Sequence, residues 1–188
     1  MTSLVLVDFQ TGLSDPARGP RNNPDAEMRA GELLAAWRAR GWPVFHVRHA
    51  SVSPNSPLRP DQPGFAFHPA VQPGEGEPVL TKSVNSGFIG TDLEARLHAS
   101  GSDRVVICGL TTPHCVSTTV RMAANLGFMV TLVADACAAN TANADSNFPG
   151  AMLGDLTPEL IHQMAIAHLN GEFCTVVTTA SLLASLPV

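Results

Sequence analysis

Short apolar segments alternate with longer segments of mixed polarity along the chain. The apolar segments are rich in valine, leucine and isoleucine, which is typical of strands buried on both faces of a sheet. They predict strands at residues 3–8, 43–48, 78–81, 104–109, 129–134 and 174–178. The intervening segments predict helices at residues 24–40, 92–100, 113–126, 158–170 and 180–186. This alternation predicts an α/β fold in which helices cover both faces of a parallel sheet.

Local signals mark several of the predicted helix ends. Asn23-Pro24 and Thr157-Pro158 each combine a capping residue with a proline suited to the first helical position. The segment Thr91-Asp92-Leu93-Glu94 has the pattern of a capping box. Glycines follow four of the helices, at positions 41, 101, 127 and 171. Since no repeat or linker divides the chain, a single domain over residues 1–188 is expected.

Two long segments depart from the alternation. Residues 50–77 are rich in proline and glycine, and residues 137–156 are rich in alanine, asparagine and glycine. Loops of this length usually form lids, pocket walls or interface arms, the alternative being a solvated surface excursion. Four aromatic residues lie in or beside them: Phe65, Phe67, Phe88 and Phe148. An aromatic-lined pocket is one interpretation of these residues, and ordinary packing is the other.

Composition narrows the class of protein. The 188 residues are 45% hydrophobic and 14% charged, which suits an ordered domain with a sizeable core and leaves room for an oligomer interface. The net charge of −5 argues against nucleic acid or an anionic membrane as the main partner. The chain opens on a strand pattern rather than a signal peptide, and it contains no apolar stretch of membrane-spanning length. Four cysteines without C-x-x-C spacing favour a reducing cytoplasm.

Cys115 is the first candidate for chemistry. It follows the apolar segment 104–108 in the run Gly109-Leu110-Thr111-Thr112-Pro113-His114-Cys115. Thr112 can cap a helix and Pro113 fits the first helical position, so Cys115 is expected in the first turn. Unpaired amides and the helix dipole favour a thiolate there. The alternative is a small core residue, as most buried cysteines are.

Three reactive side chains follow predicted strands. Asp8 comes after the first strand, Lys82 after the third and Cys115 after the fourth. Ligands of an open parallel sheet bind beyond the carboxyl ends of its strands. Individually, these could be a turn residue, a surface lysine and a core cysteine. An acid, an amine and a thiol at equivalent topological positions together favour an active site. Residues 8–13 contain no G-x-G-x-x-G, which weakens a dinucleotide-binding interpretation.

Three segments resemble the isochorismatase-like cysteine hydrolase superfamily. They are Leu4-Val5-Leu6-Val7-Asp8-Phe9-Gln10, the segment 82–93 and the segment 109–116, with Asp135-Ala136 downstream. The superfamily includes nicotinamidases, N-carbamoylsarcosine amidases, ureido-group hydrolases and streptothricin hydrolases. The resemblance extends in order and spacing to about Ala139. It implies a three-layer Rossmann-like fold with a six-stranded parallel sheet of order 3-2-1-4-5-6, and a cis peptide between Leu110 and Thr111.

The resemblance also implies roles for individual residues. Asp8, Lys82 and Cys115 correspond to an Asp–Lys–Cys triad in which Asp8 takes the thiol proton and Lys82 stabilises the resulting charge. Backbone N–H groups of Thr111 and Cys115 would hold the oxyanion, and no redox cofactor is needed. Four further residues are expected to line the substrate pocket: Gln10, Phe88, Thr112 and His114.

The histidines offer two rival interpretations. A dyad of His114 with Cys115 is disfavoured because adjacent helical residues point roughly 100° apart. Nicotinamidases carry an Asp–His–His metal site, but Val44-Phe45-His46-Val47-Arg48-His49 lacks their Asp-x-His pattern. Strand alternation sends His46 and His49 to opposite faces. We therefore predict no metal and no cofactor, which also disfavours nicotinamide as substrate, and we interpret both histidines as structural or as residues at the pocket entrance.

These observations predict a hydrolase that cleaves a C–N bond of a small amide, lactam, ureido or carbamoyl compound through a thioester on Cys115. Isochorismatase-type vinyl ether hydrolysis and a non-catalytic binding protein on the same fold are the alternatives. The expected partners are a small-molecule substrate and further copies of the chain, as a dimer or tetramer. The other three cysteines are interpreted as packing residues: Cys108, Cys137 and Cys174.

Overall fold

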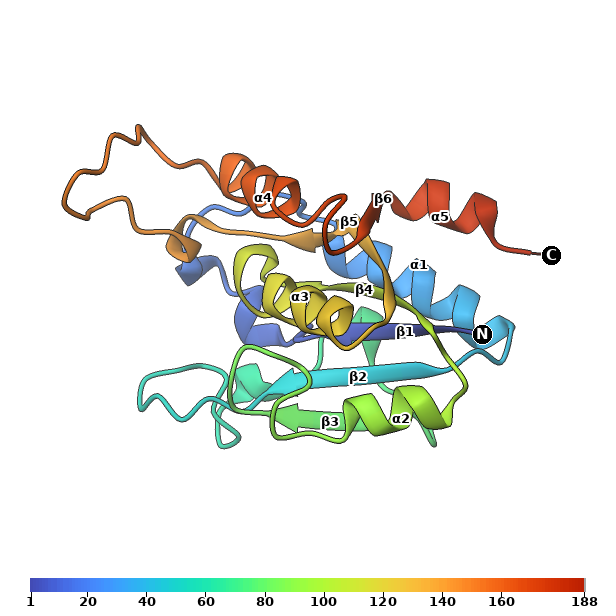
Figure 1. The fold of residues 1–188 in the computed structure, drawn as a ribbon. Coiled ribbons are helices and arrows are strands. Elements are labelled where there is room, and N and C mark those ends of the chain that lie inside the picture. The colour runs from blue at the N-terminus through green and yellow to red at the C-terminus, as the bar shows by residue number, and fades with distance from the viewer. Residues whose placement is uncertain (188) are drawn as a thin grey trace.

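The chain forms a six-stranded sheet in which every neighbouring pair of strands is parallel. The computed structural model describes residues 1–187. The strand order is β3-β2-β1-β4-β5-β6, which confirms the predicted topology (Figure 1). The bounds of the strands are β1 (Thr2–Val7), β2 (Val44–His49), β3 (Val79–Lys82), β4 (Arg104–Leu110), β5 (Met129–Ala138) and β6 (Thr175–Val177).

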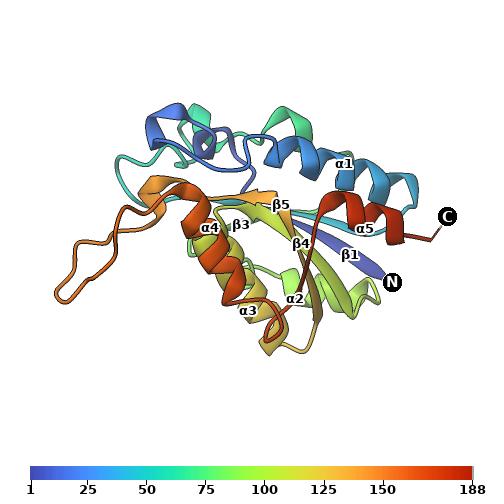
Figure 2. The same cartoon turned by 90° about the horizontal axis from the view of Figure 1, so that it is seen from above.

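Helices cover both faces of this sheet. Helices α1 (Ala26–Ala39) and α5 (Thr179–Ser185) lie on one face (Figure 2). The other face carries α2 (Leu93–Ala99), α3 (Ser117–Asn125) and α4 (Pro158–Ala167) (Figure 2). Each predicted strand and helix is present with ends shifted by a few residues, so the alternating pattern predicted the architecture. Among residues 1–187, no helix has the length and hydrophobicity needed to cross a bilayer.

The predicted helix caps have mixed outcomes. Thr157 caps α4 as expected, because its side chain accepts a hydrogen bond from the Leu160 N–H and Pro158 occupies the first helical position. The capping box at 91–94 does not form, since Thr91 donates its hydroxyl to the Gly87 carbonyl and the Asp92 side chain caps no N–H. Helix α1 begins after Asp25 rather than Asn23.

The central strands form a rigid platform for the residues at their carboxyl ends. Leu4 and Leu6 of β1 and Ile107 of β4 are at most 1% exposed, and each such side chain contributes about 1.5–3 kcal/mol of burial free energy. Gly109 lets β4 approach β1, because a Cβ there would overlap the carbonyl oxygen of Val7. Val7 and Gly109 are paired in register. The residues immediately after these two strands are therefore held close together.

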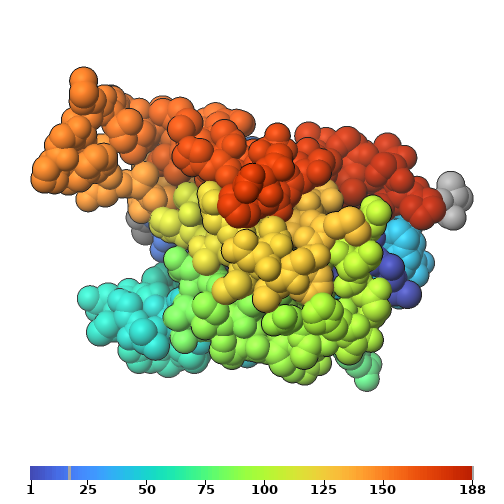
Figure 3. Space-filling model, viewed as in Figure 1, coloured from blue at the N-terminus to red at the C-terminus, as the bar shows by residue number. Residues whose placement is uncertain are grey.

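Both long segments begin at the carboxyl edge of the sheet, and segment 50–77 then returns beside α1 to the start of β3. Segment 50–77 packs against the body and makes an antiparallel bridge between Phe67 and Gln10. Strand β5 extends into the second segment as far as Ala138, beyond its predicted end. Residues 144–156, which we call the arm, project away from the body as the orange loop of Figures 1 and 3.

Candidate active site

Asp8 occupies a strained backbone position directly after β1. Its φ of 54° lies in the left-handed region, which is uncommon for a residue other than glycine. The surroundings impose this conformation, since the Asp8 N–H donates to the Val47 carbonyl at 2.8 Å and the Asp8 side chain is fully buried. Such strain is concentrated at functional sites.

Lys82 connects the reactive groups. It ends β3 and is 1% exposed. Its Nζ lies 2.5 Å from Asp8 Oδ2, 3.4 Å from Cys115 Sγ and 3.2 Å from His49 Nδ1. An ammonium has three N–H donors, so these three contacts can use all of them. Asp8, Lys82 and Cys115, which are far apart in sequence, thus meet at one point of the structure.

Cys115 lies on a π-helical turn, η5 (Thr112–Val116), that joins β4 to α3. The sequence instead predicted an α-helical first turn capped by Thr112. The Thr112 hydroxyl contacts His162 Nδ1 at 2.8 Å, and Thr111 occupies the N-cap position without a side-chain cap. Cys115 is partly exposed, whereas the other three cysteines are buried, as predicted for packing residues.

The electrostatics of the thiol reverse one expectation from the sequence. Burial, with a further contribution from the Asp8 charge, raises the pKa of Cys115 to about 12. A pKa raised in this way favours the neutral thiol, which is the opposite direction from the thiolate expected at a helix terminus. Burial and the nearby carboxylate outweigh the opposing effect of Lys82.

Asp8 is suited to accept the thiol proton. Burial raises the pKa of its carboxyl against the opposing charge of Lys82, which makes the carboxylate a stronger base than an exposed aspartate. Lys82 engages only Oδ2, and the buried Oδ1 has no hydrogen-bond partner among residues 1–187. One carboxylate oxygen is thus available beside a neutral thiol.

His49 is a site residue that the sequence analysis did not assign to the reactive cluster. It pairs with Lys82 in the β2–β3 register. The Gln10 side-chain amide binds the His49 backbone: it donates to the carbonyl at 3.1 Å and accepts from the N–H at 2.8 Å. Burial and the Lys82 charge lower the pKa of His49, so the neutral ring can accept the Lys82 hydrogen bond at Nδ1. The signal in the sequence was its place at the end of a strand, beside that of Lys82.

His46 lies on the opposite face of β2, as strand alternation predicted. It is fully buried and contacts Glu77 Oε2 at 2.7 Å through Nε2. Its ring meets Phe67 edge to face, with centroids 5.8 Å apart. The Arg38 guanidinium, with a smaller contribution from His46, lowers the pKa of Glu77 to about 2. His46 therefore has a structural role.

One group of side chains has the chemistry of a metal site. Single ligand atoms of Asp8, His49 and Cys115 lie within 4.8 Å of one another. The Lys82 ammonium, however, is at hydrogen-bonding distance from all three residues. A divalent ion about 3 Å from it would meet a repulsion on the order of 10 kcal/mol at an effective dielectric constant of about 20. This donor set does not fit a metal while Lys82 is charged.

A cavity of about 130 Å³ opens beside the reactive groups. Its walls come from the segments after β1, β2, β3, β4 and β5. The lining residues are Asp8, Leu13, Arg18, His49, Leu58, Asn85, Leu110, Thr111, His114, Cys115 and Asn143. The peptide bond between Leu110 and Thr111 is cis, and both of these residues line the cavity together with Cys115.

Of the four residues expected to line the substrate pocket, His114 is among the described residues that line this cavity, and Gln10, Phe88 and Thr112 are not. The Gln10 amide binds backbone groups of His49 and Phe65 instead. Phe88 stacks on Phe128 with ring centroids 6.2 Å apart, and Thr112 is bound to His162. Among the described residues that line this cavity there is no phenylalanine, which favours ordinary packing as the interpretation of these aromatic residues. Arg18, Asn85 and Asn143 carried no recognisable motif and were missed.

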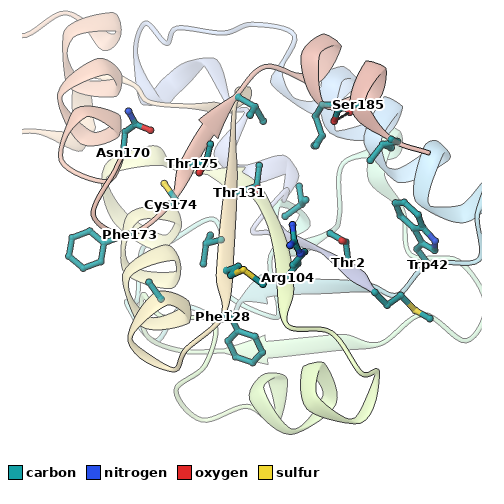
Figure 4. A pocket seen from close by; sticks show the side chains of 18 of the residues that line it. Thr2, Trp42, Arg104, Phe128, Thr131, Asn170, Phe173, Cys174, Thr175 and Ser185 are labelled. Atoms are coloured by element: carbon teal, nitrogen blue, oxygen red, sulfur yellow. Dashed lines mark hydrogen bonds between the residues drawn. The ribbon is translucent and has the colours of Figure 1, made fainter. Parts of the chain in front are cut away.

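A larger cavity of about 940 Å³ lies at the opposite, amino-terminal ends of the strands. Figure 4 shows Thr2, Arg104 and Thr175 around it, with Ser185 of α5 nearby. None of Asp8, Lys82 and Cys115 lines this cavity. The reactive groups instead occupy the carboxyl edge, where ligands of open parallel sheets bind.

Comparison with known proteins is consistent with this geometry. The isochorismatase domain profile matches residues 2–181. The chain is 42% identical to the uncharacterized isochorismatase family protein YrdC of Bacillus subtilis, over 96% of this chain and 94% of the relative. It is 30% identical to a maleamate amidohydrolase of Pseudomonas putida, over 90% of this chain and 88% of that relative. It is 31% identical to a streptothricin hydrolase of Streptomyces noursei, over 95% of this chain and 63% of that relative.

Solved structures share the whole fold. The crystal structure of an isochorismatase from Pseudomonas putida superposes with a TM-score of 0.83 at 33% identity, covering 96% of this chain and 89% of that one. An isochorismatase-family structure from Chromobacterium violaceum has a TM-score of 0.89 at 46% identity, covering 98% and 92%.

Proposed function

The chain belongs to the isochorismatase family of hydrolases, and we propose that it cleaves a C–N bond of a small amide, lactam or ureido compound through a thioester on Cys115. The observation that carries this proposal is the contact of Lys82 with both Asp8 and Cys115, beside a carboxylate oxygen of Asp8 that has no partner among residues 1–187. The names of the streptothricin hydrolase and maleamate amidohydrolase relatives support the amide class.

The first step joins Cys115 to the substrate. As the sulfur attacks the carbonyl carbon, the thiol proton moves to Oδ1 of Asp8 and the carbonyl electron pair moves to oxygen. Backbone N–H groups of Thr111 and Cys115 hold this oxyanion, a contribution typically worth about 2.7–4 kcal/mol for each donor. Lys82 stabilises the negative charge that passes between sulfur and carboxylate.

The leaving group departs in the second step. The oxyanion collapses, the C–N bond breaks, and the proton on Asp8 moves to the leaving nitrogen. A thioester on Cys115 and a free amine remain. Water then attacks the thioester, its proton returns through Asp8 to the sulfur, and the acid product leaves. Asp8 thus acts as base and acid in turn, and the thiol is regenerated.

His49 is assigned a positioning role in this scheme. Its neutral ring accepts a hydrogen bond from Lys82 and thereby fixes the ammonium between Asp8 and Cys115. Gln10, which was expected in the pocket, holds the His49 backbone in turn. The two residues are therefore proposed to support the reactive groups rather than to bind substrate.

Two alternative functions are tested by the same experiment. Vinyl ether hydrolysis of the isochorismatase type does not require a nucleophilic thiol, and a binding protein requires none of the three reactive groups. A panel of amides, lactams, carbamoyl amino acids and ureido compounds, screened for ammonia or amine release, tests the proposal. We expect turnover of an amide or ureido compound. Hydrolysis of isochorismate without any C–N hydrolysis would contradict the amidase assignment.

Activity is expected to survive removal of metal ions. The reason is the Lys82 ammonium, which lies at hydrogen-bonding distance from Asp8, His49 and Cys115 and repels a cation from this group of candidate ligands. The measurement is kcat after exhaustive dialysis against EDTA, with a mock-dialysed sample as control. Loss of turnover that zinc or iron restores would show that the metal-free scheme is wrong.

We also propose that the chain associates with itself through the arm. Met152 is 97% exposed, Leu153 57% and Phe148 52%. An apolar groove of about 520 Å³ lies between α3, α4 and the base of the same chain's arm, and its walls include Leu160 and Met164 of α4 and Leu153 and Leu156 of the arm. Among the described residues that line the groove there is Arg121 and no acidic residue, whereas residues 144–156 carry two aspartates and no basic residue. The exposed apolar side chains and the negative charge of the arm therefore match the apolar walls and the positive charge of the groove in a second copy of the chain.

The substitution Met152→Glu is expected to convert a dimer into a monomer, because it places a charge among the apolar contacts at a position free of the chain's own core. Light scattering during size-exclusion chromatography measures the mass. Met28→Glu, at a residue that is 60% exposed on α1, is the matched control and should remain dimeric. A monomeric wild-type chain, or a dimer that tolerates Met152→Glu, would rule out this association.

We also propose that the chain is one hydrolase domain and that it functions in a reducing compartment. One sheet and one reactive cluster support a single hydrolase domain over the chain. The four cysteines are free, which supports a reducing compartment such as the cytoplasm.

A further inference from the structure

We propose that the substrate carries a carboxylate and that Arg18 binds it. This inference rests on the hydrolase function proposed above and names the class of amide that the pocket selects. The candidates are monoamides of short dicarboxylic acids and carbamoyl derivatives of small amino acids.

Arg18 lines the cavity that holds Asp8 and Cys115. It ends a short 3-10 turn (Pro16–Arg18) in the segment that follows β1. Its buried Nε has no hydrogen-bond partner, and no salt bridge reaches Arg18 within residues 1–187. Arg21, three residues later, makes a salt bridge to Glu27 at 2.7 Å. An arginine that faces a pocket without a carboxylate partner is suited to receive one from a ligand.

The charge inside the cavity favours an anion. Asp8 is the only acidic residue among the described residues that line the cavity, and the adjacent Lys82 compensates its charge. Cys115 is a neutral thiol and His49 a neutral imidazole at neutral pH. Arg18 therefore leaves the cavity with a net positive charge, in a chain whose formal net charge is −5. An anionic group would offset this charge and pair with the guanidinium in a charge-assisted hydrogen bond.

Two asparagines add hydrogen-bond donors to the same cavity. Asn143 uses Oδ1 to accept the Asn140 N–H at 2.8 Å, so its amide N–H groups are available as donors. Asn85 places Oδ1 3.8 Å from Cys115 Sγ, and its amide nitrogen likewise remains a donor. A substrate with an amide carbonyl and a carboxylate offers acceptors that match these groups. A purely apolar amide would leave the guanidinium without a partner.

The size of the cavity limits the substrate. Its volume is about 130 Å³, so we choose probes in which the carboxylate lies only a few bonds from the scissile carbonyl. Succinamate and N-carbamoylglycine have this length and serve as probes, with butyramide and ethylurea as neutral counterparts in which a methyl group replaces the carboxylate.

The test compares kcat/KM within each matched pair, by ammonia release. Wild-type protein should prefer the carboxylate member by at least about tenfold. Arg18→Gln should lower kcat/KM for the carboxylate member by about 10–100-fold, the loss expected for one charge-assisted hydrogen bond. The neutral member should change by less than about twofold. Arg18→Lys should retain part of the preference because it keeps the charge without the fork of donors. Arg104→Gln, at the opposite end of β4, is the control.

A second readout does not depend on turnover. Succinate should slow the alkylation of Cys115 by iodoacetamide in wild-type protein, whereas neutral succinamide should not. The protection should disappear in Arg18→Gln. Absence of protection by succinate in wild-type protein would overturn the inference.

The outcomes distinguish a failure of the proposed role of Arg18 from a failure of the proposed hydrolase function. If neither member of either pair is hydrolysed but succinate still protects Cys115 in an Arg18-dependent manner, the carboxylate site stands and the choice of reaction is wrong. If both members are hydrolysed equally, or if Arg18→Gln lowers both equally, the hydrolase function stands and the role of Arg18 is wrong.

Discussion

The substitution Asp8→Asn is expected to lower kcat by about 10²–10⁴-fold, the usual contribution of a positioned acid–base group. Asparagine keeps the shape of the side chain but can neither accept the thiol proton nor return it to the leaving nitrogen. The test is steady-state turnover of the compound that the amide panel identifies. Asp61→Asn, at an exposed loop residue, is the control and should retain the wild-type kcat.

Alkylation distinguishes this role from a purely structural one. The Asp8 charge raises the pKa of Cys115 and the Lys82 charge lowers it, so removal of the carboxylate leaves Lys82 to stabilise the thiolate. Cys115 in Asp8→Asn should therefore react with iodoacetamide at neutral pH at least as fast as in wild-type protein, although turnover falls. A parallel fall in both rates would mean that Asp8 only maintains the site. Because the variant leaves Lys82 without its counterion, kcat is compared below its measured Tm.

The substitution Cys115→Ala is expected to have the largest effect, with turnover reduced on the order of 10⁵–10⁶-fold, as when a nucleophile that acts as part of a unit is removed from other hydrolases. Binding should persist, because Arg18 and the asparagines of the cavity are unchanged. Calorimetry with the substrate should give a Kd close to the wild-type value.

The controls for this variant come from the other thiols. Cys137→Ala and Cys174→Ala remove buried cysteines that do not line the active-site cavity, so their kcat values should stay close to wild type. The double variant Cys115→Ala, Asp8→Asn should be no less active than Cys115→Ala alone, since groups that act together give non-additive losses. Independent, additive losses would argue against one catalytic unit.

The sequence pattern predicted the fold class and placed the reactive groups at one edge of the sheet. The apolar segments marked all six strands, and the carboxyl ends of neighbouring parallel strands share one edge of a sheet. Asp8 follows β1, Lys82 ends β3 and Cys115 lies on the turn after β4, so all three lie at that edge, where Lys82 contacts the other two. The strand order came from the resemblance to a family, because periodicity does not specify which strands are neighbours.

Other features of the site depend on contacts that sequence patterns do not encode. Burial among distant segments raises the pKa of Cys115, and the local pattern of a helix start does not indicate this burial. Thr112 was expected to cap a helix, but His162, fifty positions away, binds its hydroxyl. Arg18 reaches the cavity from a short turn in an irregular segment that has no periodic signal. Residues on loops were therefore the ones that the sequence analysis missed.

The central claim is that Cys115 carries the acyl group of the substrate during turnover. Acid quenching of wild-type protein during steady-state hydrolysis, followed by intact-mass and peptide mass analysis, tests this most directly. We predict a mass increase equal to the acyl part of the substrate, located on the peptide that contains Cys115 and absent from Cys115→Ala. Wild-type turnover by Cys115→Ala, or an acyl group found on another residue, would contradict the claim.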